Sequence, residues 1–163
     1  MRIVVCVKHV PDMQSERRFE GGRLVRGEDD VLNELDENAI EAAVQLKETE
    51  EDAGREAEVV ALTMGPEDAE DALMRALQMG ADRAYIVSDE FLEGSDVITT
   101  ASVLSVAIAK IADECGPVDL VITGMASLDA MTSMLPGALA AKAHMPLLGL
   151  ARSMSVEDGT VTI

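Results

Sequence analysis

Aromatic side chains are almost absent from this sequence. It contains no tryptophan, and only Phe19, Phe91 and Tyr85 carry aromatic rings among its 163 residues. A buried core must therefore consist of aliphatic side chains and methionine, of which there are 10. A chain of this length can bury a sufficient core without disulfides or a metal. We therefore expect a single α/β domain over residues 1–163.

Positive charge is also scarce. The 13 lysines and arginines face 31 acidic residues, which gives a formal net charge of -18. Such a surface would be repelled by nucleic acid and by anionic membranes, so we expect neither as a partner. No stretch reaches the roughly 18 apolar residues of a membrane span, and the first residues do not resemble a signal peptide. We expect a cytoplasmic protein without membrane insertion.

Several sequence motifs of catalytic and metal sites are missing as well. Cys6 and Cys115 are far apart and form no CxxC pair, which predicts reduced thiols and no metal site. Neither GxGxxG nor GxxxxGK[ST] occurs, which excludes the standard dinucleotide and P-loop motifs. His9 and His144 belong to different predicted elements, and no serine lies in a GxSxG turn. We predict no catalytic residues.

Apolar runs and helical periodicity alternate along the chain. The runs predict strands at residues 3–7, 59–64, 84–87, 119–124 and 147–151, and the periodic segments predict helices at residues 33–47, 65–80, 95–111 and 135–143. This alternation predicts a doubly wound, Rossmann-like α/β fold: a mainly parallel five-stranded sheet with helices on both faces. Asp158-Gly159 predicts a C-terminal hairpin.

Residues 12–32, called the excursion below, interrupt this pattern. They mix charges with Gly21 and Gly22, show little periodicity and could form a small hairpin. Long loops of this kind in compact domains are usually functional. In doubly wound folds, ligands bind at the carboxyl ends of the strands, where the strand order reverses. The sequence therefore predicts a site formed by residues that follow the first, second and fourth strands.

Spaced segments at these positions resemble a known family. They are Val7-Lys8-His9-Val10-Pro11-Asp12, Asn33-Glu34-Leu35-Asp36-Glu37-Asn38-Ala39, Met64-Gly65-Pro66, Ala76-Leu77-Gln78-Met79-Gly80-Ala81-Asp82-Arg83 and Asp119-Leu120-Val121-Ile122-Thr123-Gly124 leading to Asp129. Together they span nearly the whole chain and resemble the beta subunit of electron transfer flavoproteins, most of all its bacterial branch.

The resemblance implies cofactors, partners and site residues. In this family the beta subunit binds a structural AMP and forms a heterodimer with an alpha subunit that holds most of the FAD. The pair carries electrons from dehydrogenases through a quinone reductase to the respiratory chain. Family beta subunits continue beyond Ile163 into segments that wrap the alpha subunit. The implied nucleotide-binding residues are Cys6, Lys8, Asn33, Glu34, Leu35, Asp36, Met64, Gly124, Met125, Ala126, Ser127, Asp129, Thr132, Ser133, Met134 and Leu135.

Simpler roles remain open for several of these residues. We expect Asn33 to be a helix cap first and Cys6 to be an inert buried thiol. Lys8 could form a salt bridge with an acidic residue as readily as it could bind phosphate. Asp129 either contacts ribose or caps its loop. At the level of the whole chain, two alternatives remain: a bifurcating-type beta subunit with its own FAD in place of AMP, and a stand-alone ATP- or AMP-binding sensor of the same fold.

Overall fold

Four parallel strands form the centre of the molecule in a computed structural model that describes residues 1–163. They are β1 (Arg2–Cys6), β6 (Glu58–Met64), β7 (Arg83–Val87) and β8 (Leu120–Thr123). Their order across the sheet is β7-β6-β1-β8. The chain therefore builds the sheet outward from β1 in one direction and then adds β8 on the other side, so the order reverses between β1 and β8.

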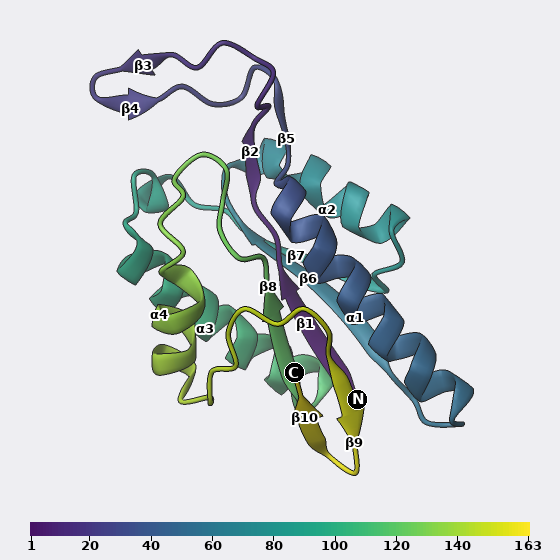
Figure 1. The fold of residues 1–163 in the computed structure, drawn as a ribbon. Helices are drawn as coiled ribbons and strands as arrows, with labels where there is room; N and C mark the ends of the chain where they lie inside the picture. The colour runs from purple at the N-terminus through teal and green to yellow at the C-terminus, as the bar shows by residue number, and fades with distance from the viewer.

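Helices cover both faces of this sheet (Figure 1). Helices α1 (Glu34–Asp52) and α2 (Glu70–Gln78) pack on one face, the latter after a 3₁₀ turn, η1 (Glu67–Ala69). Helices α3 (Val97–Cys115) and α4 (Leu135–Ala143) pack on the other, and a 3₁₀ turn, η2 (Glu90–Leu92), precedes α3. The predicted doubly wound α/β class is confirmed.

The strands supply both halves of the core because successive side chains point to opposite faces of a sheet. Ile3, Val5, Val59 and Ala61 pack against α1 and α2. The intervening residues, Val4, Cys6, Val60 and Leu62, pack against α3 and α4. All eight are buried, which explains the continuous apolar runs of β1 and β6.

Three antiparallel pairs extend from this frame. Strands β2 (His9–Pro11) and β5 (Asp30–Leu32) close the base of the excursion, and β3 (Phe19–Glu20) and β4 (Arg23–Leu24) form the small hairpin at its tip. Strands β9 (Ser155–Glu157) and β10 (Thr160–Thr162) form the predicted C-terminal hairpin. Its turn residues Asp158 and Gly159 have φ values of 48° and 74°, as a type I′ turn requires.

The prediction of a fifth strand at residues 147–151 is wrong. This segment has no regular structure, and the sheet ends at β8. Leu150 has a φ of 58°, in the left-handed region that an extended strand does not allow. The side chains of Leu147, Leu148 and Leu150 are exposed, so the apolar pattern reflects a surface segment here rather than a buried strand.

No helix of this fold combines the length and the apolar character that crossing a membrane requires.

Candidate functional site at the carboxyl ends of strands β1 and β8

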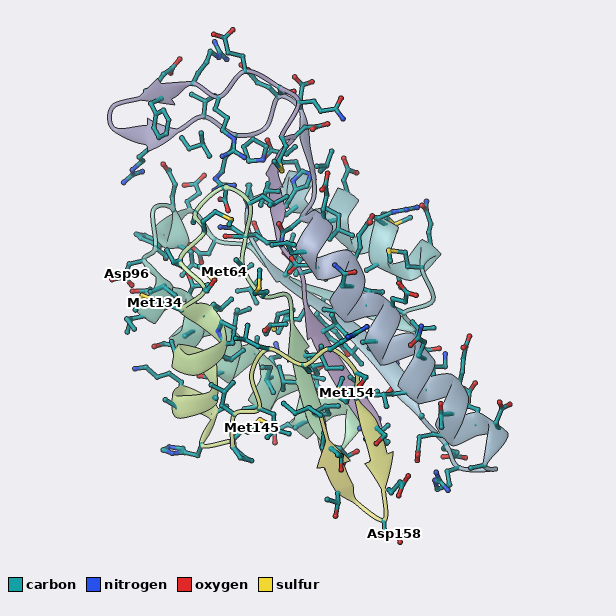
Figure 2. All side chains as sticks on the ribbon, viewed as in Figure 1. Met64, Asp96, Met134, Met145, Met154 and Asp158 are labelled. Carbon is teal, nitrogen blue, oxygen red and sulfur yellow. The ribbon has the colours of Figure 1, made fainter.

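Two segments meet where the strand order reverses. One is the start of the excursion together with the beginning of α1, and the other is residues 124–134, called the switch-point loop below. In Figure 1 the excursion rises beyond the carboxyl end of the sheet, and the green switch-point loop lies at the same end. Figure 2 places Met64 and Met134 toward this end, whereas Met154 and Asp158 lie toward the opposite one.

The switch-point loop begins with an unusually close approach of two backbones. A Cβ atom added to Gly124 would lie 2.2 Å from Asp36 Oδ1 and 2.9 Å from the Leu35 carbonyl oxygen. No real Cβ tolerates such distances, so only glycine permits this approach. Gly124 therefore lets the loop after β8 lie directly against the first turn of α1.

Asp36 is a buried carboxyl group in this contact. It is 6% exposed, and its Oδ2 accepts a hydrogen bond of 2.9 Å from the backbone N–H of Lys8. Burial raises the pKa of Asp36 to about 7, although hydrogen bonds from Asn33 and the Lys8 backbone and the charge of Lys8 oppose the shift. Asp36 thus links the end of β1 to α1 and titrates near neutrality.

Asn33 fixes the loop from the other side. Asn33 is fully buried. Its Nδ2 donates to the Ala126 carbonyl at 2.9 Å, and its Oδ1 accepts from the Leu128 backbone N–H at 3.0 Å. Helix α1 begins directly after Asn33, as expected, but the Asn33 side chain makes no capping hydrogen bond. Asn33 therefore occupies the N-cap position, as expected, but its side chain does not cap the helix, because both ends of its amide bond to the switch-point loop.

Two cations converge on Asp129 in the middle of the loop. Lys8 Nζ lies 2.9 Å from Asp129 Oδ2, and Arg26 Nη2 pairs with the same oxygen. The Asp129 side chain is 2% exposed. Burial alone would raise the pKa of Asp129, but the hydrogen bonds from Lys8 and Arg26 outweigh burial and hold the pKa below its ordinary value. Asp129 is therefore a paired, ionised carboxylate rather than a cap of its own loop.

The second half of the loop presents backbone donors. Met131 and Ser133 have φ values of 52° and 50°, in the left-handed region that residues other than glycine adopt uncommonly. The N–H groups of Thr132, Ser133, Met134 and Leu135 have no acceptor within the protein. Leu135 starts α4, and Pro136, which has no N–H, occupies its first turn. Consecutive free N–H groups at a helix start are suited to bind an anion such as phosphate.

The remaining predicted residues lie around this centre with different exposure. Ala126 is buried, Ser127 lies 3.5 Å from Lys8 Nζ through its Oγ, and Glu34 and Met125 are exposed. Leu35 and Met64 are half-buried at the ends of their neighbouring elements.

Cys6 ends β1 inside the core. It is 5% exposed, and burial together with the charge of Asp36 raises the pKa of its thiol to about 12. Cys6 is therefore a free, buried thiol, as expected, and its inertness stays a prediction that the raised pKa supports.

Two residues of the site were not found from the sequence. Arg17 Nη2 donates to the Leu128 carbonyl at 3.0 Å, and Arg26 reaches both Asp129 and the His9 carbonyl. Both belong to the excursion, whose charged residues show no periodicity that would mark these two. The only available signal was that the excursion contains several arginines in a strongly acidic chain.

Surface depressions do not by themselves identify this site. A depression of about 680 Å³ lies at the opposite, amino-terminal edge of the sheet, where Arg2, Glu58 and Asp119 contribute to its lining. At the switch point, Asn33 and Asp36 are buried beneath the loop that follows β8.

The strand order and the helices on both faces of the sheet define a doubly wound, Rossmann-like α/β domain. Comparison with known proteins is more specific: residues 22–163 match the family model described as electron transfer flavoprotein domain. The chain belongs to the electron transfer flavoprotein family.

Curated relatives agree with this assignment. The chain is 39% identical to the electron transfer flavoprotein subunit beta of Mycobacterium tuberculosis over 98% of its own length and 60% of the relative. It is 37% identical to the corresponding subunit of Megasphaera elsdenii over 100% of its length and 60% of the relative. It is also 36% identical to the caffeyl-CoA reductase-Etf complex subunit CarD of Acetobacterium woodii, over 97% of its length and 58% of the relative. The chain thus spans about 60% of these relatives.

Proposed function

We propose that this chain is the nucleotide-binding domain of an electron transfer flavoprotein beta subunit, and that it binds AMP at the switch point between β1 and β8. The observation that carries the proposal is the row of free backbone N–H groups from Thr132 to Leu135. The phosphate of AMP would accept from these groups at the start of α4. Similarity to beta subunits over nearly the whole chain supports the same assignment.

In this function the AMP is structural and the chain has no catalytic residue of its own. The FAD would be held mainly by an alpha subunit, and this chain would help to orient it, as proteins generally do for cofactors that perform the chemistry. The heterodimer would pass electrons between dehydrogenases and a quinone reductase. An alpha subunit would also cover apolar surface, and Leu147, Leu148 and Leu150 are exposed on one short segment.

We place the heterodimer in the cytoplasm. Cys6 and Cys115 are both free thiols, which suits a reducing compartment.

The nucleotide is identified by denaturing the purified chain and analysing the released small molecules by mass spectrometry and absorbance. AMP without flavin is the expected result. FAD released from the chain alone would instead indicate the bifurcating-type beta subunit, and ATP would indicate a nucleotide sensor. A chain that releases nothing and binds no added AMP would contradict the proposal.

A variant pair assigns the bound nucleotide to the switch point. Gly124→Ala introduces a Cβ against Asp36, whereas Gly149→Ala adds one where no atom lies within 4 Å. We expect AMP to be lost from the first variant and retained by the second. Retention of AMP by Gly124→Ala in a folded chain would show that the nucleotide binds elsewhere.

A further inference from the structure

Two side chains of the excursion bond to the switch-point loop, and both are arginines. Arg17 donates to the Leu128 carbonyl at 3.0 Å, and Arg26 pairs with Asp129. The other hydrogen bonds within the excursion brace it internally, among them the Val25 N–H to the Arg18 carbonyl at 3.0 Å. The two arginines therefore connect the excursion to this loop.

The residues that they hold form the midpoint of the loop. Both backbone polar groups of Leu128 are bonded: its carbonyl accepts from Arg17, and its N–H donates to the Asn33 side chain. Asp129 is fixed by Arg26 and Lys8. Anchoring these two positions leaves the loop little freedom before the strained residues Met131 and Ser133.

A tight turn connects the anchored residues Leu128 and Asp129 to the free N–H groups that follow. The Ala130 and Met131 N–H groups both donate to the Ser127 carbonyl, at 3.2 and 2.8 Å. The free N–H groups of Thr132 to Leu135 follow directly after this turn. Their direction therefore depends on where residues 127–129 are held.

We propose that Arg17 and Arg26 are positioning residues for the nucleotide, which they serve by holding the switch-point loop from the excursion. The inference rests on the proposed AMP site and adds the part of the molecule that controls it. Neither arginine needs to contact the nucleotide. Without them the loop would open more often, and the nucleotide would leave faster.

The excursion also supplies matched controls. Arg18 pairs with Glu28 within the excursion, and Arg23 pairs with Glu93 beside η2 at 2.6 Å. Both carry the same charge as Arg17 and Arg26 and belong to the same segment, but neither bonds to the switch-point loop. Alanine variants at these positions remove one positive charge without releasing the loop.

The first measurement is amide hydrogen exchange in the nucleotide-free chain. We expect Arg17→Ala and Arg26→Ala to speed exchange of the bonded loop amides, those of Leu128, Ala130 and Met131, about tenfold, the change that loss of one charge-assisted hydrogen bond would produce. Exchange in β1 and β6 should not change. Arg18→Ala and Arg23→Ala should leave the exchange rates of these three amides unchanged. Equal effects of all four variants, or none in the first two, would overturn the proposal.

The second measurement is the rate at which AMP dissociates. Arg17→Ala and Arg26→Ala should raise it about tenfold for the same reason, and Arg17→Lys, which keeps a cationic donor, should restore most of the loss. Unchanged dissociation in both alanine variants would refute the positioning role. If the wild-type chain binds no AMP, the proposed function fails, but the exchange rates of the nucleotide-free chain still decide whether the two arginines hold the loop.

Discussion

Strands β1 and β8 are neighbours with similarly apolar sequences, yet they are buried to very different extents. Four of the five residues of β1 are buried, whereas all four residues of β8 are only partly buried. Strand β1 has a hydrogen-bonded neighbour on each side, and β8 has one. The difference shows that an apolar run in the sequence predicts a strand but not how deeply that strand is buried, because burial depends on how many elements pack around it.

Burial differs even more between a central strand and the segment after α4. Leu62 in β6 is 0% exposed, whereas Leu150 after α4 is 86% exposed. Truncating each to alanine is the most direct test. Leu62→Ala should lower the free energy of unfolding by about 4 kcal/mol, because it leaves a cavity in a packed core. Leu150→Ala should change it by less than about 0.5 kcal/mol. Urea denaturation of the two variants measures both values, and similar losses would mean that the Leu150 segment is packed in solution.

The next largest loss of stability is expected where the loop after β8 touches the first turn of α1. Gly124→Ala forces a Cβ against Asp36 Oδ1 and the Leu35 carbonyl, so we expect a loss of about 3 kcal/mol, the upper end for overpacking. Gly149→Ala has open space and should remain within about 0.5 kcal/mol of the wild type. Thermal unfolding of the pair measures the contrast. A stable Gly124→Ala chain would mean that the loop after β8 moves away from α1 at little cost.

The pH dependence of stability distinguishes the two carboxyl groups of the candidate site, Asp36 and Asp129. The pKa of Asp36 is raised from 3.8 to about 7 in the folded chain, so the folded state keeps a proton that the unfolded state releases. The free energy of unfolding should therefore fall as the pH rises from about 4 to about 7, by an amount on the order of 4 kcal/mol. Asp36→Asn should flatten this slope in denaturation curves measured across the window.

Asp129 provides the opposite control. Its pKa is lowered, so its stabilising contribution is present above pH 3.8 and is lost as the pH falls further. Asp129→Asn should therefore leave the slope between pH 4 and 7 in place. Loss of that slope in Asp129→Asn, with the slope intact in Asp36→Asn, would reverse the assignment.

The smallest effect is expected from the ion pairs. Lys8→Gln removes one of the two partners of buried Asp129, and we expect a loss of about 1 kcal/mol because Arg26 remains and Lys8 is partly exposed to solvent. Lys110→Gln breaks the exposed helical pair with Glu114, which spans 3.8 Å, and should cost no more than about 0.5 kcal/mol. Denaturation at low and high salt compares them, and a larger loss for Lys110→Gln would contradict the burial argument.

Local patterns were sufficient to predict the frame of the fold. Helix α4 has the predicted bounds, and Asp96 caps α3 by accepting from the Thr99 N–H at 2.7 Å. Each of these features depends on residues close in sequence. The sequence also predicted a site at residues that follow the first, second and fourth strands, but the strand order, and with it the reversal between β1 and β8, came from the structure.

The contacts of the site could not be predicted in the same way. The bonds from Asn33 to Ala126 and from Arg17 to Leu128 join residues more than 90 positions apart, and no local pattern records such a pairing. Asn33 also shows how a sound local rule fails. The side chain of an asparagine before a helix usually caps it, but the switch-point loop provides two hydrogen-bond partners for the Asn33 amide. The prediction of a strand at residues 147–151 failed for a similar reason, because an apolar run joins a sheet only where a neighbouring strand is available to pair with it.

The outer side of β8 has one more consequence. Its backbone groups on that side have no strand to bond with, and its sequence, Leu120 to Thr123, contains no lysine or proline of the kind that protects such edges. An unprotected edge is a template on which another extended chain can add itself. Concentrated preparations of this chain should accordingly self-associate through β8, which size-exclusion chromatography over a range of concentrations would detect.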